Sequence, residues 1–193
     1  MDFKPQGIWY ADNCVRMPEE NKIWFAMRVT YRRELAAEAI LNKLGIENYI
    51  PKKLGTDPRN KGKKILVPAI HNLIFVYMTP SGMRQLKEDM TIPYLQYMMD
   101  KRAGAKIIVP DSQMRPFIAA TADYDETLLY FQPEELNLSK GTRVRVTAGP
   151  LEGQEGVFLK VKGARDRRLV IHIEGVIAVA KALVHPELVQ VIG

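Results

Sequence analysis

The amino-acid sequence predicts an α+β protein in which an antiparallel sheet with flanking helices is followed by a small β-barrel. The longest apolar and β-branched run, residues 64–78, carries no charged side chain between Ile65 and Met78 other than His71, which is typical of a strand covered on both faces. Helical spacing of apolar residues appears on both sides of this run. Short strand-like segments separated by turns fill residues 139–193, as expected for a barrel.

The first part of the chain alternates strand-like and helix-like segments, in the order β-α-β-β-α-β-β-α. Gly45 fits the left-handed position that follows a helix, and Thr79 or Ser81 is placed to cap the next helix. Asp111 or Ser112 is placed to cap a third helix, with Pro116 near its first turn. The expected strands are 23–31, 46–51, 70–78, 94–99 and 105–110, and the expected helices are 32–44, 82–90 and 112–120.

Residues 52–64 are strongly basic and contain two glycines and a proline, which predicts an exposed loop before the central strand. Pro68 cannot lie in the middle of a ladder, so we expect the continuous strand to begin near Ile70. The domain organisation predicted from composition is an irregular extension, a first domain, an acidic linker and a second domain, at 1–21, 22–121, 122–138 and 139–193. The apolar patch 128–131 inside the linker is expected to dock on either domain.

Composition narrows the class of protein. The chain has 193 residues and a formal charge of +6, a moderate lean toward a polyanionic partner. Cys14 is the only cysteine, and the histidines lack the spacing of metal ligands. No signal peptide, apolar membrane span, phosphate loop or nucleophile motif is recognisable. We therefore expect a cytoplasmic monomer that is not an enzyme and needs no cofactor or metal.

Residues 141–158 resemble the KOW motif, with Gly149 and Gly153 suited to turns and Gly156 to a close backbone approach. The preceding part resembles the NGN domain of the NusG family: Trp24 and Phe25 open a strand, a basic loop precedes the strand 72–77, and a helix starts at 110–112. The resemblance covers about residues 22–192. The N-terminal tail and the short basic loop make the chain more similar to specialised NusG paralogs of the UpxY and RfaH type.

This resemblance implies a transcription antiterminator that suppresses pausing and termination, here at a capsule-polysaccharide operon. Its NGN domain would bind the clamp helices of the largest subunit of RNA polymerase through an apolar depression. The family's aromatic signature Phe-Pro-Gly/Asn-Tyr corresponds here to residues 70–73, where both aromatics are aliphatic and His replaces Pro. The alternative for these apolar residues is a place in the core. The polymerase-binding residues expected on this basis are Trp24, Phe25, Ile70, His71, Leu73, Tyr97, Met98 and Met99.

Basic residues at the end of the first strand and the start of the first helix predict a nucleic-acid contact. Arginines at a helix start oppose the helix dipole, so a phosphate partner explains them better than solvent does. In RfaH-like paralogs this region contacts non-template DNA, so the partner is expected to be that strand or leader RNA. The alternative is a solvated helix start and a solvated loop. The residues concerned are Arg28, Arg32, Arg33, Lys52 and Lys53.

The second domain carries a predicted partner face made of Lys160, Lys162, Arg165, Arg167, Arg168 and Glu174. Glu174 stands where NusG has an exposed Phe that helps to engage ribosomal protein S10 and Rho, which puts binding of those two proteins in doubt. The basic members of the face are compatible with an RNA or ribosome contact, or with an ordinary soluble surface. The alternative function is therefore a general RNA- or ribosome-associated KOW protein.

Overall fold

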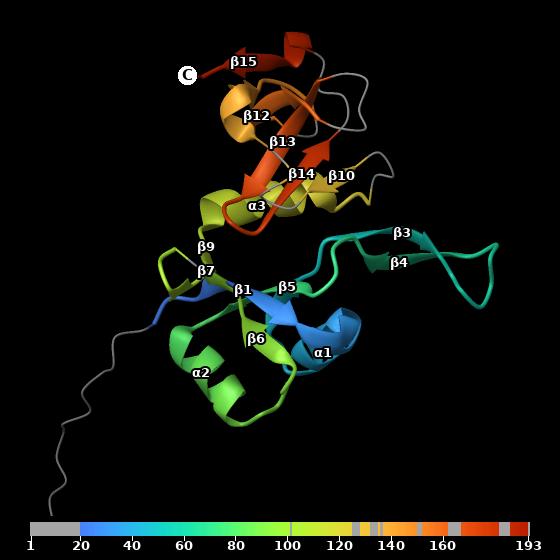
Figure 1. Cartoon of the computed structure of the whole chain (residues 1–193), viewed down its shortest axis with the longest axis vertical. Helices are drawn as coiled ribbons and strands as arrows, with labels where there is room; N and C mark the ends of the chain where they lie inside the picture. The colour runs from blue at the N-terminus through green and yellow to red at the C-terminus, as the bar shows by residue number, and fades with distance from the viewer. Residues whose placement is uncertain are drawn as a thin grey trace, which may run out of the picture.

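The structure, a computed structural model, describes residues 20–100, 102–124, 128–131, 135, 137–149, 152–161, 167–181 and 186–192. It contains two large antiparallel sheets, and helix α3 (Asp111–Thr121) lies between them (Figure 1). The predicted fold class, an antiparallel sheet with helices followed by a second domain rich in strands, is confirmed. Within these ranges no helix has both the length and the apolar character needed to cross a membrane.

The first sheet has the strand order β2-β5-β1-β6, with β9 also paired to β1. Its strands are β1 (Ile23–Val29), β2 (Glu47–Tyr49), β5 (Leu73–Met78), β6 (Leu95–Tyr97) and β9 (Ile108–Val109). β5 pairs on both sides and its first four residues are buried, as predicted for the central strand. It begins at Leu73 rather than near Ile70, because residues 69–72 form a turn.

Alternation along the strands gives this sheet two buried faces. One face, which we call the α3 face, packs against α3 and includes Trp24, Ala26, Leu73 and Phe75. The other, which we call the α1/α2 face, packs against α1 (Glu34–Lys43) and α2 (Pro80–Glu88) and includes Phe25, Met27, Ile74 and Val76. A short 3-10 turn, η1 (Thr30–Arg32), joins β1 to α1.

Capping agrees with the sequence at one helix and differs at another. The Thr79 hydroxyl accepts a hydrogen bond from the Gly82 N–H at 3.1 Å, so Thr79 caps α2 as predicted. For α3 the predicted cap at Asp111 or Ser112 is wrong. The helix begins at Asp111 with Pro110 as its N-cap and no side-chain cap, and Pro116 lies inside the helix. The extended residue before the helix is therefore a proline, whose fixed φ suits that position.

The basic segment 52–64 is not a simple loop. Its first part forms β3 (Lys52–Thr56), which pairs with β4 (Lys64–Pro68) in a hairpin that projects from the sheet (Figure 1). Residues 64–68, which the sequence assigned to the central run, thus belong to a separate arm that ends at Pro68. A second small hairpin joins β7 (Met99–Asp100) to β8 (Ala105–Lys106).

The second sheet has six strands in the order β10-β14-β13-β12-β11-β15. They are β10 (Leu129–Phe131), β11 (Thr142–Val146), β12 (Glu155–Lys160), β13 (Arg167–Ile173), β14 (Ile177–Lys181) and β15 (Val189–Val191), with turns η3 (Leu138–Lys140) and η4 (Pro186–Leu188). A Cβ on Gly156 would lie 2.6 Å from the Val170 carbonyl oxygen, which confirms the predicted close approach. β10 comes from the predicted linker and pairs with β14 as the outermost strand at that side of the sheet.

Helix α3 connects the two sheets physically. The Phe117 ring lies 6.0 Å from that of Phe75, and one continuous apolar cluster contains residues of the α3 face, of α3 and of β11, β13 and β14. The Gln113 side-chain oxygen accepts a hydrogen bond of 3.0 Å from the Glu174 N–H. Tyr130 of β10 donates from its hydroxyl to the Lys52 carbonyl oxygen at 3.4 Å. The two sheets therefore share one apolar core, and the Gln113–Glu174 and Tyr130–Lys52 hydrogen bonds add polar contacts to it.

Candidate functional site

The residues predicted to bind polymerase divide between the two faces of the first sheet. Ile70 and Met98 pack against the cluster of the α3 face, whereas Tyr97 packs against that of the α1/α2 face. The division follows from the pleat, since neighbouring strand residues point to opposite sides. In the same way Trp24 lies on the α3 face and Phe25 on the other. A single surface cannot include all eight predicted residues.

Burial separates the predicted contacts further. Trp24, Phe25 and Leu73 are 5%, 4% and 3% exposed, so no partner reaches them in this conformation. Their side chains are part of the two apolar cores, Trp24 and Leu73 on the α3 face and Phe25 on the α1/α2 face. Ile70 and Met98 are half-buried on the α3 face, and His71 is exposed beside Ile70. We call these three residues the Ile70 surface: Ile70 and His71 lie on the turn at 69–72, and Met98 directly follows β6.

Tyr97 and Met99 flank Met98 in the chain but have different surroundings: Tyr97 packs on the α1/α2 face and Met99 begins β7. The Lys106 amine lies 3.9 Å from the centre of the Tyr97 ring, so a cation of the chain already covers that ring. Met99 is 49% exposed and opposes Lys106 in the small hairpin of β7 and β8. Both side chains therefore lie beside the charged Lys106 amine, which differs from the apolar depression expected from the sequence.

A buried carboxylate fixes the turn that carries Ile70 and His71. Glu34, at the first position of α1, is 1% exposed, and it accepts a hydrogen bond from the Asn72 N–H. His71 Nδ1 lies 3.7 Å from the same carboxylate oxygen. Asn72 has a φ of 62°, and its side-chain oxygen accepts from the Arg32 N–H at 3.4 Å. The turn at 69–72 and the turn before α1 are thus held together as one unit.

Two of the predicted arginines, Arg32 and Arg33, lie on this unit, and Arg28 lies nearby in the chain, on β1. Arg28, Arg32 and Arg33 are all exposed, and among the described residues none has a carboxylate within 4.0 Å. The Arg33 guanidinium lies 5.6 Å from the ring centre of Tyr31 and 5.2 Å from that of Tyr94. Neither tyrosine is among the residues predicted from the sequence, although Tyr31 stands directly before Arg32 and Arg33. The turn therefore presents positive charge together with aromatic rings.

The two predicted lysines occupy a different place. Lys52 donates to both oxygens of Glu38 at 2.7 and 2.8 Å, so its charge is balanced by α1. Lys53 is exposed on β3, in the hairpin that projects from the sheet (Figure 1). We call Arg28, Arg32 and Arg33 together the arginine turn. Lys53 is separate from them, on the hairpin.

The predicted partner face of the second domain also divides. Lys160 and Arg167 oppose each other across β12 and β13, whereas Glu174 follows the far end of β13 and its backbone N–H donates to Gln113 of α3. Arg168 is half-buried and is not without an interaction partner. Lys162 and Arg165 lie outside the described residues. Glu174 therefore belongs to the contact with α3 and not to the basic end of the sheet.

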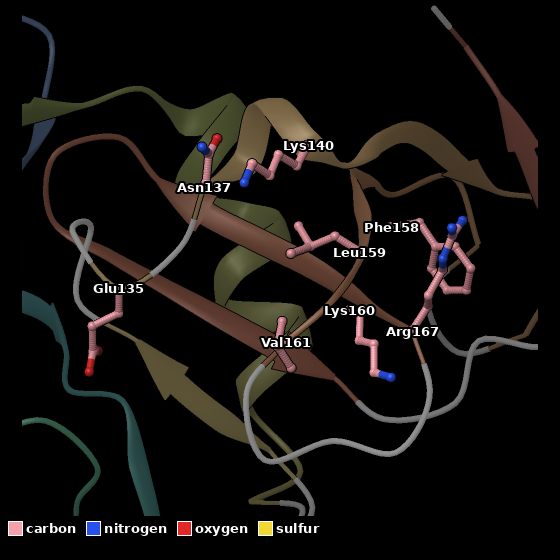
Figure 2. Close-up of a pocket in the computed structure, with 8 residues that line it drawn as sticks. All are labelled: Glu135, Asn137, Lys140, Phe158, Leu159, Lys160, Val161 and Arg167. Carbon is pink, nitrogen blue, oxygen red and sulfur yellow. The ribbon is translucent and has the colours of Figure 1, made fainter.

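The basic end borders a shallow hollow of about 350 Å³ (Figure 2). Its lining includes the cations Lys140, Lys160 and Arg167 and one acid, Glu135, around apolar side chains such as Leu159. Figure 2 shows Lys140 and Lys160 on opposite sides of Leu159 and extending in different directions. The cations line the rim separately, an arrangement suited to an extended anion and not to one small phosphate.

Two titratable groups, His172 on β13 and Tyr49 beside α3, have shifted pKa values. Burial lowers the pKa of His172, while the nearby Glu174 charge opposes this change and Arg143 adds to it. Burial raises the pKa of Tyr49, whose hydroxyl lies 2.5 Å from that of Thr121 on α3. Across the described ranges no cluster of three or more His, Cys, Asp or Glu is arranged to hold a metal ion.

Comparison with known proteins places these surfaces in context. A family model described as "Transcription termination factor nusG" matches residues 22–118. The chain is similar to a solved structure described as "Domain interaction in Thermotoga maritima NusG", with 21% identity and a TM-score of 0.44. That match covers 90% of this chain and 98% of the other. No curated protein matches the chain.

Proposed function

This chain belongs to the NusG family of transcription factors, and from that membership we propose that it binds RNA polymerase during elongation and acts as an antiterminator. The observation that carries the proposal is the family match over residues 22–118, the region that holds both the Ile70 surface and the arginine turn. Binding rather than bond chemistry would do the work. Favouring the unpaused state of polymerase by about 1–3 kcal/mol is enough for regulation of this kind.

The proposed polymerase contact is the Ile70 surface, made of Ile70, His71 and Met98, with the clamp helices of the largest subunit as partner. Ile70 and His71 lie on the turn whose Asn72 N–H donates to Glu34, and Ile70 and Met98 pack against the cluster of the α3 face. A methionine adapts its shape to a partner helix more readily than a branched side chain. Trp24, Phe25 and Leu73 support the surface from below and are not proposed as contacts.

The proposed nucleic-acid contact is the arginine turn, with Arg28, Arg32 and Arg33 facing the non-template strand or leader RNA. Its support is the exposure of three cations without a carboxylate partner among the described residues. A locus-specific paralog needs a nucleic-acid contact to find its operon, and we propose a capsule-polysaccharide operon from the resemblance to the UpxY type. Loss of the factor is then expected to reduce distal transcripts of that operon, measured by transcript mapping.

Retention of RNA polymerase by the tagged full-length chain tests the proposed function. Ile70→Glu is expected to abolish retention, because it places a charge in an apolar contact. The matched control is Ile108→Glu. Ile108 is 50% exposed in the same sheet and pairs with Phe25 of the α1/α2 face, so this variant should retain polymerase. Equal retention by both variants would show that the Ile70 surface is not the polymerase contact. If the parent chain itself retained no polymerase, the proposed function would be wrong.

The basic rim around the hollow of the second domain favours one alternative, a general RNA- or ribosome-associated protein. This alternative predicts that Lys160→Glu combined with Arg167→Glu abolishes RNA binding by the full chain. Antitermination predicts that the same double variant still retains polymerase. The two measurements together decide between the functions, since each alternative assigns the essential contact to a different sheet.

A further inference from the structure

The turn between β1 and α1 holds an exposed tyrosine in an unfavourable backbone conformation. Tyr31 has φ 61° and ψ 29°, and Arg32 follows with φ 54°, so two consecutive residues with side chains adopt the left-handed region. Bulky residues rarely do so, and such outliers gather at functional sites. Tyr31 is also 82% exposed, more than any other large apolar side chain among the described residues. Core packing therefore does not explain this ring.

The surrounding structure holds the strained turn in place. The Arg32 N–H donates to the Asn72 side-chain oxygen at 3.4 Å, and Glu34 accepts from the Asn72 N–H. These bonds tie the turn to a second one from a distant part of the chain. Strain that is maintained by specific contacts presents a side chain in one fixed place. Here the side chain so presented is the Tyr31 ring.

Arg33 orients this ring and leaves one side of it open. Its guanidinium lies between two aromatic rings, 5.6 Å from the centre of Tyr31 and 5.2 Å from the centre of Tyr94. Cation–π contacts of this kind hold the arginine against one side of Tyr31. Because the side chain remains 82% exposed, its other side is accessible to a flat partner.

The charges around the ring point to the class of that partner. Arg32 and Arg33 lie in and directly after the turn, and Arg28 lies on β1 three residues before Tyr31. Within the described ranges none of the three has a carboxylate within 4.0 Å. An open aromatic ring beside uncompensated arginines suits an unpaired base and its flanking phosphates. A base inside a duplex cannot use the ring, because both of its faces are already stacked. The arrangement therefore selects single strands.

We propose that Tyr31 is a stacking platform for one unpaired base of a single-stranded nucleic acid, with Arg28 and Arg32 contacting neighbouring phosphates. The proposal rests on the nucleic-acid contact in the proposed function and identifies the element recognised there, an unstacked base. It needs no polymerase for its test, so its failure is separable from failure of polymerase retention. Arg33 acts through Tyr31 as a positioning residue.

The experiment measures binding of fluorescent twelve-nucleotide probes to the full-length chain by anisotropy at fixed salt. The probes are oligo(dT), its RNA equivalent, the duplex form and an abasic strand. Tyr31→Ala is expected to weaken binding to the single strands by about ten- to a hundredfold, the usual effect of removing one base–aromatic stack. Tyr31→Phe should bind like the parent, because it retains the ring. The DNA and RNA arms tell which strand is preferred.

Two controls separate stacking from folding and from charge. Tyr31→Asn removes the ring but tolerates positive φ, so it should keep the turn and lose binding as Tyr31→Ala does. The abasic probe should bind parent and Tyr31→Ala equally, and Arg28→Gln should reduce the salt dependence whereas Tyr31→Ala should not. Unchanged binding by Tyr31→Asn, an equal loss on the abasic probe, or duplex binding as tight as single-strand binding would overturn the proposal.

Discussion

Glu34 and Asn72 are 38 residues apart in the chain, yet the buried carboxylate of the first accepts a hydrogen bond from the backbone N–H of the second. The bond joins the start of α1 to the turn that precedes β5. One side of this joint carries Arg32 and Arg33, and the other carries Ile70 and His71. A single buried acid thus sets the relative position of the two proposed contacts.

Glu34→Ala is expected to lower the free energy of unfolding by about 1–3 kcal/mol, because it leaves the Asn72 N–H without its partner. Glu34→Gln should cost less, since its amide oxygen can still accept. Glu38→Ala is the control. Glu38 pairs with Lys52 in an ion pair whose side chains are 21% and 19% exposed, and its loss should cost about 1 kcal/mol. Urea unfolding of the three variants checks the order, and equal losses at Glu34 and Glu38 would contradict it.

Gly156→Ala is expected to destabilise the second sheet by about 1–3 kcal/mol. The added Cβ would meet the Val170 carbonyl oxygen at 2.6 Å, and backbone cannot move aside as a side-chain end can. Gly62→Ala serves as the matched substitution, because its Cβ would approach only the Asn60 side-chain oxygen, at 3.7 Å. Thermal unfolding should show a lowered midpoint for Gly156→Ala and little change for Gly62→Ala.

The free energy of unfolding should fall as the solution is acidified below pH 6.5, in part because of His172. Burial lowers the His172 pKa from 6.5, so the unfolded chain takes up a proton before the folded chain does. The associated stability is complete above pH 6.5 and is lost as pH falls through the lower folded pKa. His172→Gln should flatten this slope in urea titrations at a series of pH values.

Glu174→Gln provides the opposite control for His172. The Glu174 charge raises the His172 pKa and so opposes burial. Removing that charge should lower the pKa further and make the acid loss of stability larger than in the parent. Its backbone N–H bond to Gln113 is retained in this variant. A slope that both variants leave unchanged would show that another group is responsible.

Periodicity was sufficient to predict the second sheet and the burial of β5, because alternation and β-branched content are local properties of the chain. It also contained the division of Tyr97 from Met98, which a reading of 97–99 as one apolar block overlooked. The strand character of Lys52–Thr56 was not readable in the same way. Those residues are basic and contain a glycine, and only pairing with β4 makes them extended.

The candidate site was less predictable than the fold. Three arginines next to a helix start signal a polyanion from sequence alone, and the structure exposes all three. By contrast, an acid at a helix start such as Glu34 normally faces solvent, and nothing local indicates that it is buried. The left-handed conformation of Tyr31 likewise depends on Asn72, which comes from another part of the chain.

The place of α3 between the two sheets has a thermodynamic consequence. Phe117 is fully buried in a cluster to which both sheets contribute, so neither sheet can unfold without exposing apolar surface of the other. The chain should therefore melt as one cooperative unit, with a single calorimetric peak whose van't Hoff and calorimetric enthalpies agree. Phe117→Ala should shift that peak as a whole, while two resolved peaks in the parent chain would contradict the coupling. Because α3 packs against both sheets, a change in its packing alters the stability of both sheets together.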